Sequence, residues 1–413
     1  MAEFFDTYET QDPEVREASL LAELPRQIAH AQEKTEYFGK LLADVSAGDT
    51  TSRDALAQLP VTYKSDLIDA QAANPPFGGL NAIPPGQMSH LFLSPGPIAE
   101  GEGTSFDWWR GARSLFAAGF RKGDIVINTF SYHFTPGAWL TDHSARSLGC
   151  AVFPGGVGQT ERQVEAINWY KINGFIGTPD FLKIVMDKAD ELGVDISCMK
   201  NALVGAGALP PSLRKEVINR GVSCVQNYGT ADLGVVSYES EAMEGMILSE
   251  GLIVEIVRPG TGEPVAEGEV GEIVVTHITN KDYPLIRFAT GDLSAIMPGL
   301  SPCGRTAPRI KGWMGRADQS TKVRGMFVRP NQVANVLKRH PEASKARIVI
   351  GSENGRDTMV FKAEVEGQPD GLANAIAASI ESDIRIRPNS VELVAPGSLP
   401  NDGLVIQDTR TYE

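Results

Sequence analysis

The sequence predicts an α/β protein with a large multi-layer α/β amino-terminal domain, a β-rich subdomain within it, and a small, mobile α+β carboxyl-terminal domain. Three observations support this fold class. The 413 residues exceed one typical domain. Short apolar runs alternate with helical segments from about residue 124, and the texture changes again near residue 315. We place the domains at 1–317 and 318–413.

The first 105 residues predict helices that cover a sheet, followed by a loop. Residues 13–45 carry apolar positions at helical spacing after an acidic start, which predicts one or two amphipathic helices. The segment LAQLPVTYKSDLIDA predicts a proline-broken connection into a short helix. The stretch SPGPIAEGEGTS at 94–105 is rich in glycine and proline, so we expect a loop there.

From residue 124 the order of elements is typical of a parallel sheet. The apolar runs IVINTF, CAVFPGG, GFIGTP and NALVGAG are separated by helical segments, among them ERQVEAINWYKI and FLKIVMDKADELG. Strands that alternate with helices in this way form parallel α/β sheets, which bind ligands at the carboxyl ends of their strands.

Two further changes of pattern complete the chain. Residues 248–276 contain two β-rich runs around a Gly/Pro/Glu turn, which predicts an antiparallel unit. After residue 315, VRPNQVANVLKRH predicts a helix, and ARIVIGS, TMVFKAEVE and SVELVAP predict strands.

Composition excludes several classes of function. A net charge of −14 without a basic block argues against nucleic-acid binding and against a membrane-surface role. The four cysteines are scattered, which predicts reduced packing residues. Neither a signal peptide nor a run of transmembrane length is present in the sequence, so we expect a cytoplasmic protein.

Three motifs follow one another along the chain. VGAGALPPSLR ends a predicted strand on small residues, which leaves room for a flat group. VQNYGTADLG presents an aromatic ring, a hydroxyl and a carboxylate from one turn, which suit an adenine ring, a phosphate oxygen and a divalent metal. PLIRFATGDL places Asp292 at a turn, where its carboxylate could accept both hydroxyls of a ribose. Taken singly, VQNYGTADLG is better explained by an ordinary glycine turn with a capping aspartate, and a Gly-Asp turn such as that of PLIRFATGDL is very common.

In this order, and with GRADQSTKVRGMFVRP at a composition boundary, the motifs resemble the adenylate-forming enzymes and, within them, the phenylacetate-CoA ligase family. GGVGQTERQ, NPPFGG and LAQLPVTYKSDLIDA are also similar to that family, so the resemblance covers essentially the whole chain.

The resemblance implies roles for particular residues. The catalytic residues would be Thr230 at a phosphate and Asp232 at a magnesium ion. Asp318 would be the hinge about which the small domain rotates. The nucleotide site, with Tyr228 stacked on adenine and Asp292 and Arg316 at the ribose, would comprise Gly205, Ala206, Gly207, Asn227, Tyr228, Gly229, Thr230, Asp292 and Arg316.

The acyl group would lie near Tyr132, His133 and Phe134, although an aromatic core cluster explains these residues equally well. The implied substrates and cofactors are a small, aromatic carboxylic acid, ATP, CoA and Mg²⁺. The family resemblance also makes a homodimer an expectation.

Two departures from the family pattern matter for function. The phosphate loop of the family is rich in Ser, Thr and Gly and ends in Lys, whereas SPGPIAEGEGTS has no lysine and contains Glu100 and Glu102. The family also has a catalytic lysine near the carboxyl terminus, whereas no lysine follows Lys362 here. A cation at a developing negative charge contributes a few kcal/mol to lowering a barrier, so adenylation is expected to suffer.

The sequence therefore supports an AMP-forming acid-CoA ligase as the leading hypothesis. The alternative is a degenerate homologue that binds a nucleotide, acyl-adenylate or acyl-CoA without efficient ATP-dependent adenylation. A third hypothesis retains only acyl transfer from a preformed adenylate or thioester.

Overall fold

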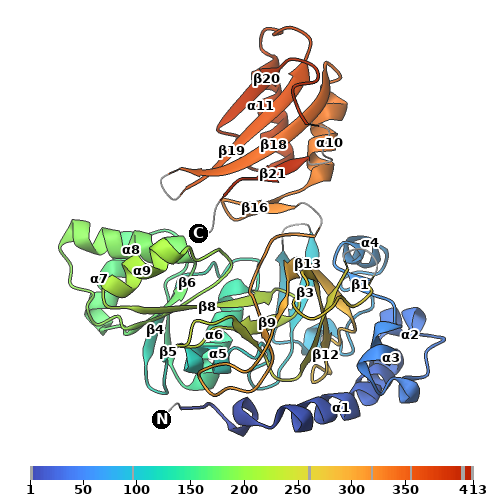
Figure 1. Ribbon diagram of the computed structural model, residues 1–413. Helices are drawn as coiled ribbons and strands as arrows, with labels where there is room; N and C mark the ends of the chain where they lie inside the picture. The colour runs from blue at the N-terminus through green and yellow to red at the C-terminus, as the bar shows by residue number, and fades with distance from the viewer. Residues whose placement is uncertain are drawn as a thin grey trace. The chain divides into compact units, whose positions relative to one another are not determined.

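The chain forms two compact units, Met1–Met314 and Gly315–Glu413. The computed structural model describes residues 3–94, 97–258, 262–317, 320–353, 356–400 and 405–410. Figure 1 colours the chain from blue at the amino terminus to red at the carboxyl terminus. The hinge residue Asp318, predicted from the family resemblance, lies outside the described residues.

Unit 1 is built on a nine-stranded sheet in the described part of the chain, with strand order β14-β15-β10-β9-β8-β7-β6-β4-β5. The neighbouring strands β8, β7, β6, β4 and β5 are parallel to one another. The pairs β14–β15, β15–β10, β10–β9 and β9–β8 are antiparallel. The strands are β4 (Ile125–Asn128), β5 (Ala151–Pro154), β6 (Gly174–Gly177), β7 (Asn201–Val204), β8 (Ser223–Thr230), β9 (Gly234–Tyr238), β10 (Met246–Leu248), β14 (Ile296–Met297) and β15 (Arg309–Ile310).

The predicted alternation of strands and helices in this region is confirmed. Helix α8 (Pro179–Leu192) shows why the local sequence predicts a helix. It begins on a proline and ends before Gly193, which has a φ of 63°. One face of the helix is buried, with Leu182, Val185, Met186 and Ala189. The other helices of this part are α5 (Ala112–Ala117), α6 (Gly137–Leu148), α7 (Thr160–Tyr170) and α9 (Pro211–Asn219).

A second sheet in unit 1 has the order β1-β13-β12-β11. Its strands are β1 (Thr62–Tyr63), β11 (Leu252–Val257), β12 (Gly271–His277) and β13 (Phe288–Ser294). β11 and β12 pair antiparallel, which confirms the prediction for residues 248–276.

The predicted amino-terminal helices are present as α1 (Pro13–Lys34) and α2 (Glu36–Leu41). They are followed by α3 (Arg53–Ala57) and α4 (Asp66–Ala73), and short 3-10 turns lie at Thr7–Thr10, Ala47–Asp49 and Pro85–Gln87. No helix in the described ranges is both long and apolar enough to cross a membrane.

The expectation of a loop over residues 94–105 was wrong for much of that stretch. β2 (His90–Ser94) and β3 (Ile98–Glu102) form an antiparallel hairpin, in which Phe92 faces Glu100 and His90 faces Glu102. Both glutamates are at most 2% exposed. Glutamate and glycine have low strand propensity, but buried polar partners from distant segments hold this strand.

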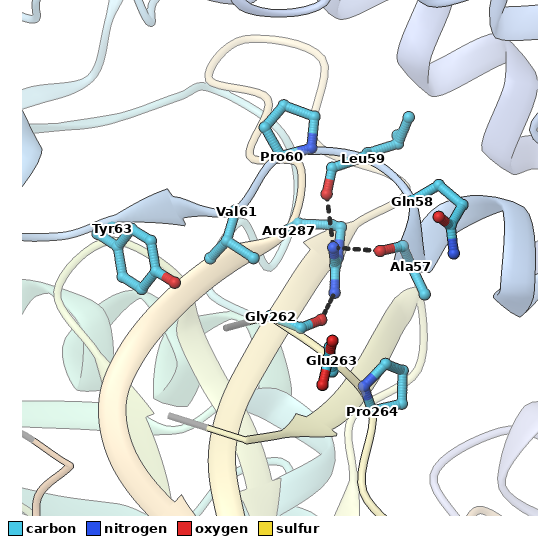
Figure 2. Close-up of a pocket in the computed structure, with 10 residues that line it drawn as sticks. All are labelled: Ala57, Gln58, Leu59, Pro60, Val61, Tyr63, Gly262, Glu263, Pro264 and Arg287. Carbon is cyan, nitrogen blue, oxygen red and sulfur yellow. Dashed lines mark hydrogen bonds between the residues drawn. The ribbon is translucent and has the colours of Figure 1, made fainter. Parts of the chain in front are cut away.

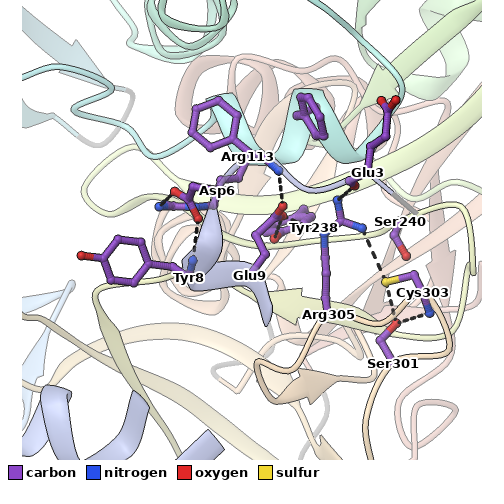
Figure 3. A network of polar contacts seen from close by, with 12 residues as sticks. Glu3, Asp6, Tyr8, Glu9, Arg113, Tyr238, Ser240, Ser301, Cys303 and Arg305 are labelled. Carbon is purple, nitrogen blue, oxygen red and sulfur yellow. Dashed lines mark hydrogen bonds and ion pairs between the residues drawn. The ribbon is translucent and has the colours of Figure 1, made fainter. Parts of the chain in front are cut away.

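The amino-terminal segment is fastened to the end of unit 1 by a buried polar network, shown in Figure 3. Glu9 accepts hydrogen bonds from Arg305 Nε at 2.7 Å and from the Tyr238 hydroxyl at 3.0 Å. Arg113 pairs with Asp6 beside it. All four cysteines are free, as the sequence predicts, and Cys303 lies within this network, where Arg305 donates to its sulfur.

Unit 2 is a small α+β fold of the predicted kind. Its main sheet has the order β20-β19-β18-β21, and helix α11 buries Leu372, Ile376, Ile380 and Ile384 on one face. The elements are β16 (Thr321–Val323), β17 (Met326–Val328), α10 (Pro330–Arg339), β18 (Ala343–Glu353), β19 (Arg356–Val365), α11 (Leu372–Ile384), β20 (Ser390–Val394) and β21 (Ile406–Asp408).

Candidate active site

The first two motifs meet at the carboxyl ends of neighbouring strands. Residues Gly205, Ala206 and Gly207 follow β7, and Asn227 lies in the last part of β8, which pairs parallel with β7. A Cβ on Gly205 would lie 2.5 Å from Asn227 Oδ1, so a larger residue would displace the Asn227 side chain from its present position. The predicted adenine-binding segments are therefore adjacent.

Tyr228 and the predicted ribose residue Asp292 are in direct contact. The Tyr228 hydroxyl donates to Asp292 Oδ2 at 2.8 Å, and Trp313 Nε1 donates to Asp292 Oδ1 at 2.9 Å. These bonds use part of the acceptor capacity of a carboxylate, which has about four lone-pair positions. Asp292 is thereby fixed on β13 beside the end of β8.

The turn after β8 carries Gly229, Thr230 and Asp232. A Cβ on Gly229 would lie 2.4 Å from the Gly234 carbonyl oxygen, so the tight return from β8 to β9 requires glycine. Thr230 Oγ1 accepts from the Leu233 amide at 3.1 Å. Asp232, whose side chain is 2% exposed, accepts from Lys64 Nζ at 2.6 Å.

Lys64 was not among the predicted site residues, yet it brings a cation to this turn. It lies between β1 and α4, within the LAQLPVTYKSDLIDA segment. Its Nζ lies 2.6 Å from Asp232 and 4.0 Å from Glu100 Oε1. The hairpin that replaces the expected phosphate loop therefore contributes a carboxylate beside an existing lysine–aspartate pair.

Glu100 is an unusual buried carboxyl group. Burial, together with the negative charge of Asp232, raises its pKa to about 7. Ser94 donates to Oε2 at 2.6 Å, whereas Oε1 has no hydrogen-bond partner in the described structure. A proton on Glu100 near neutral pH is consistent with this environment.

Because its pKa in the folded state exceeds the usual 4.5, Glu100 stabilises the fold below about pH 4.5, and this contribution is lost as the pH rises through about 7. As the pH rises from 4.5 to about 7, we expect the free energy of unfolding of the wild type to fall by about 3 kcal/mol relative to that of Glu100→Gln. Urea titrations of both proteins at several pH values measure this difference. A difference that does not change with pH would contradict the assignment.

The donor set around Asp232 does not fit a resident magnesium ion. Asp232 is bonded to the ammonium group of Lys64, and a second cation there would be repelled. No group of three or more His, Cys, Asp or Glu side chains within the described ranges could hold a metal ion. The predicted metal role of Asp232 has no support from this geometry.

The predicted acyl-pocket residues follow β4 and lie beside the hairpin. Tyr132 accepts from Asn128 Nδ2 at 3.1 Å and donates to Asp142 at 3.2 Å. The Leu93 amide of β2 donates to the Phe134 carbonyl at 2.8 Å. Tyr132 is partly buried, whereas His133 and Phe134 are exposed. This segment therefore shares the edge of the sheet formed by the carboxyl ends of the parallel strands.

The predicted ribose partner Arg316 belongs to unit 2. Its Nε donates to Ser320 Oγ at 3.1 Å, and its guanidinium carbon lies 5.5 Å from the Phe327 ring centroid. Asp292 belongs to unit 1. The pairing of Arg316 and Asp292 on one ribose stays a prediction.

A cavity of about 420 Å³ lies elsewhere in unit 1, and Figure 2 shows its lining. The buried Arg287 side chain in it is saturated: it pairs with Glu255 and donates to the carbonyls of Ala57, Leu59 and Gly262. The guanidinium group holds segments of unit 1 together, so this cavity is not the candidate active site.

The geometry of unit 1 therefore brings VGAGALPPSLR, VQNYGTADLG and PLIRFATGDL together around β7, β8 and β13. Residues 106–280 match the family of AMP-binding enzymes, which defines the class of the protein.

Two relatives of known family place the chain more narrowly within the AMP-binding enzymes. The chain is 29% identical to the phenylacetate-coenzyme A ligase of Aromatoleum evansii, over 88% of this chain and 86% of that protein. It is 31% identical to the phenylacetate-coenzyme A ligase of Thermus thermophilus, over 83% of this chain and 80% of that protein. The chain therefore belongs to the phenylacetate-CoA ligase family of adenylate-forming enzymes, a family of AMP-forming acid-CoA ligases.

A solved structure shares the fold over nearly the whole chain. It is a 2-hydroxyisobutyryl-CoA ligase in complex with 2-HIB-AMP and CoA in the thioesterification state, with a TM-score of 0.84 and 25% identity. The match covers 98% of this chain and 92% of that one.

Proposed function

We propose that the protein activates a small aromatic carboxylic acid with ATP as an acyl-adenylate and transfers the acyl group to CoA. In the first step a carboxylate oxygen attacks the α-phosphorus of ATP, and pyrophosphate leaves. In the second step the CoA thiolate attacks the acyl carbon, and AMP leaves. Magnesium is proposed only as the counter-ion that ATP carries, because the residues around Asp232 do not fit a resident ion.

The observation that carries this proposal is the contact of Tyr228 with Asp292 at 2.8 Å, next to the Gly205 and Asn227 pair. An aromatic ring, a carboxylate and a surface of small residues at adjacent strand ends suit adenine and ribose. In this proposal Tyr228 stacks on the base and Asp292 accepts from the ribose hydroxyls. Thr230 donates its hydroxyl to the phosphate of AMP.

Lys64 is proposed to supply the positive charge that the hairpin lacks. Its side chain is 30% exposed, and its ammonium group is held by Asp232 beside the same turn. A fixed cation near the phosphates stabilises charge that develops when pyrophosphate leaves. Unit 2, with Arg316, is proposed to close over the nucleotide and to rotate about Asp318 between the two steps.

A coupled assay tests the proposal. The protein is incubated with ATP, magnesium, CoA and each member of a panel of aromatic acids, and pyrophosphate and acyl-CoA are measured. We expect turnover with at least one aromatic acid and equal yields of pyrophosphate and thioester. Turnover with aliphatic acids alone would contradict the aromatic assignment.

A second candidate is a protein that binds an acyl-adenylate or acyl-CoA without making the adenylate efficiently. It is favoured by the β2–β3 hairpin, which brings the buried Glu100 where the family has a phosphate-binding loop, and by the absence of lysine after Lys362. Synthetic acyl-adenylate with CoA separates the two candidates. Binding of the adenylate or of acyl-CoA by calorimetry, with no thioester formed and no pyrophosphate released from ATP and any acid of the panel, would support the second, whereas rapid thioester formation from the adenylate alone would support the hypothesis that only acyl transfer is retained.

A further inference from the structure

A buried carboxylate holds two histidines at the other end of the hairpin. Glu102 on β3 is 1% exposed, and its two oxygens lie 2.6 Å from His90 Nδ1 and 2.5 Å from His143 Nδ1. His90 is its cross-strand partner on β2, and His143 lies on α6. Three elements therefore converge on one carboxyl group.

This arrangement fixes the hydrogen atoms on both rings. Although burial raises the pKa of Glu102, the hydrogen bonds from His143 and His90 lower it below its usual value, so the group is ionised. An ionised carboxylate only accepts hydrogen bonds, so each Nδ1 carries the hydrogen atom. An imidazole ring with its hydrogen atom on Nδ1 and none on Nε2 presents the lone pair of Nε2 as a hydrogen-bond acceptor.

Both acceptors are accessible. The side chains of His90 and His143 are 36% and 20% exposed. Neither Nε2 atom has a hydrogen-bond partner in the part of the chain that the structure describes, and neither is among the buried unsatisfied atoms. Two acceptors that are oriented by one carboxylate and open to solvent are available to a hydrogen-bond donor.

The pair is continuous with the predicted acyl pocket. The His90 ring packs on Trp139, with 4.2 Å between ring centroids. Trp139 meets Tyr132 edge to face at 5.3 Å, and its Nε1 donates to the Tyr132 carbonyl at 3.2 Å. An aromatic wall thus runs from Tyr132 through Trp139 to His90, with the paired acceptors at its end.

We propose that His90 and His143, oriented by Glu102, form a subsite that selects aromatic acids carrying a hydroxyl or amino substituent. The substituent donates a hydrogen bond to Nε2 while the aromatic ring packs along Trp139 and Tyr132. Acids without a donor leave the two acceptors unpaired and bind less tightly. This inference rests on the proposed function, because it places the acyl group beside Tyr132.

Calorimetry with stable adenylate analogues tests the subsite. The probes are sulfamoyladenosine derivatives of benzoic acid and of its ortho, meta and para hydroxy and amino forms. We expect at least one substituted probe to bind the wild type about tenfold more tightly than the benzoyl probe. Equal binding of all probes would overturn the subsite and leave the proposed function intact. Failure to bind any probe would overturn both.

Variants of the two histidines test whether they cause the preference for substituted probes. His90→Phe keeps an aromatic face for Trp139 but removes the acceptor, and His143→Gln is a second, independent change. Each is expected to reduce the tenfold preference, measured as the ratio of the dissociation constants of the benzoyl probe and the substituted probe. The matched control is His30→Gln on α1, whose ring contacts the Lys281 carbonyl and which should keep the full preference.

Three results would overturn the assignment. One is a variant that weakens all probes equally, which indicates a structural role. Another is the full preference retained in both variants. The third is zinc bound by the wild type at one equivalent and lost in both variants.

Discussion

Replacing Arg287 by methionine is expected to lower the free energy of unfolding by about 3–5 kcal/mol. The side chain is 2% exposed, pairs with both oxygens of Glu255 at 3.0 and 3.1 Å, and donates to three backbone carbonyls. Its removal leaves a buried carboxylate and unpaired carbonyls. Urea unfolding followed by circular dichroism measures the loss.

The control for this experiment is an exposed ion pair. Arg26 and Glu23 are paired at 2.5 Å with side chains 73% and 48% exposed, so Arg26→Met should cost less than about 1 kcal/mol. The double variant Arg287→Met/Glu255→Leu is expected to recover part of the loss, because it no longer buries an unpaired charge. A loss of less than about 1 kcal/mol in Arg287→Met would contradict the prediction.

Replacing Asp292 by alanine is expected to weaken AMP binding about 100-fold. Two hydrogen bonds between a carboxylate and the ribose hydroxyls contribute about 3 kcal/mol together, which corresponds to this factor. The change also leaves the Tyr228 hydroxyl and Trp313 Nε1 without the acceptor they share. Isothermal titration with AMP measures the affinity, and thermal unfolding shows whether the variant is folded.

Tyr228→Phe separates the two roles assigned to this pair. It keeps the aromatic plane for adenine and removes only the hydrogen bond to Asp292, so its effect on AMP affinity should stay within about tenfold. Undiminished AMP binding by folded Asp292→Ala would place the ribose elsewhere.

Local patterns were sufficient to predict the alternating helices and parallel strands of unit 1. Helix α8 has apolar residues at a period of 3.6 between a proline and a glycine, and the buried parallel strands are short apolar runs. Such signals lie within a window of about fifteen residues, which is the range in which sequence patterns carry information. The hairpin partner β3 lacks this signal, because its sequence, IAEGE, is stabilised by contacts from residues far away.

The candidate site was predictable where it lies on strand ends and not where it depends on pairing at a distance. Tyr228 and Asp292 follow recognisable motifs. Lys64 is separated from Asp232 by 168 positions, and His143 from Glu102 by 41, so neither pair leaves a local pattern. The sequence signal for Lys64 was its position in LAQLPVTYKSDLIDA, a segment that is similar to the corresponding segment of the family. His90 and His143 have no such signal, whereas His133 lies in an aromatic stretch that the family resemblance associates with the acyl pocket.

The link between Glu9 and Arg305 has a consequence for how the protein is made. The two residues are separated by 296 positions, so on the ribosome Glu9 must wait for nearly all of unit 1 to emerge before its partner exists. Until then Glu9 lacks its charged partner, although Arg113 and Tyr238 are already available to the amino-terminal segment, so this buried network is completed only late in synthesis. The contact between Glu9 and Arg305 therefore forms only when unit 1 is nearly complete, although Glu9 is among the first residues to be synthesised.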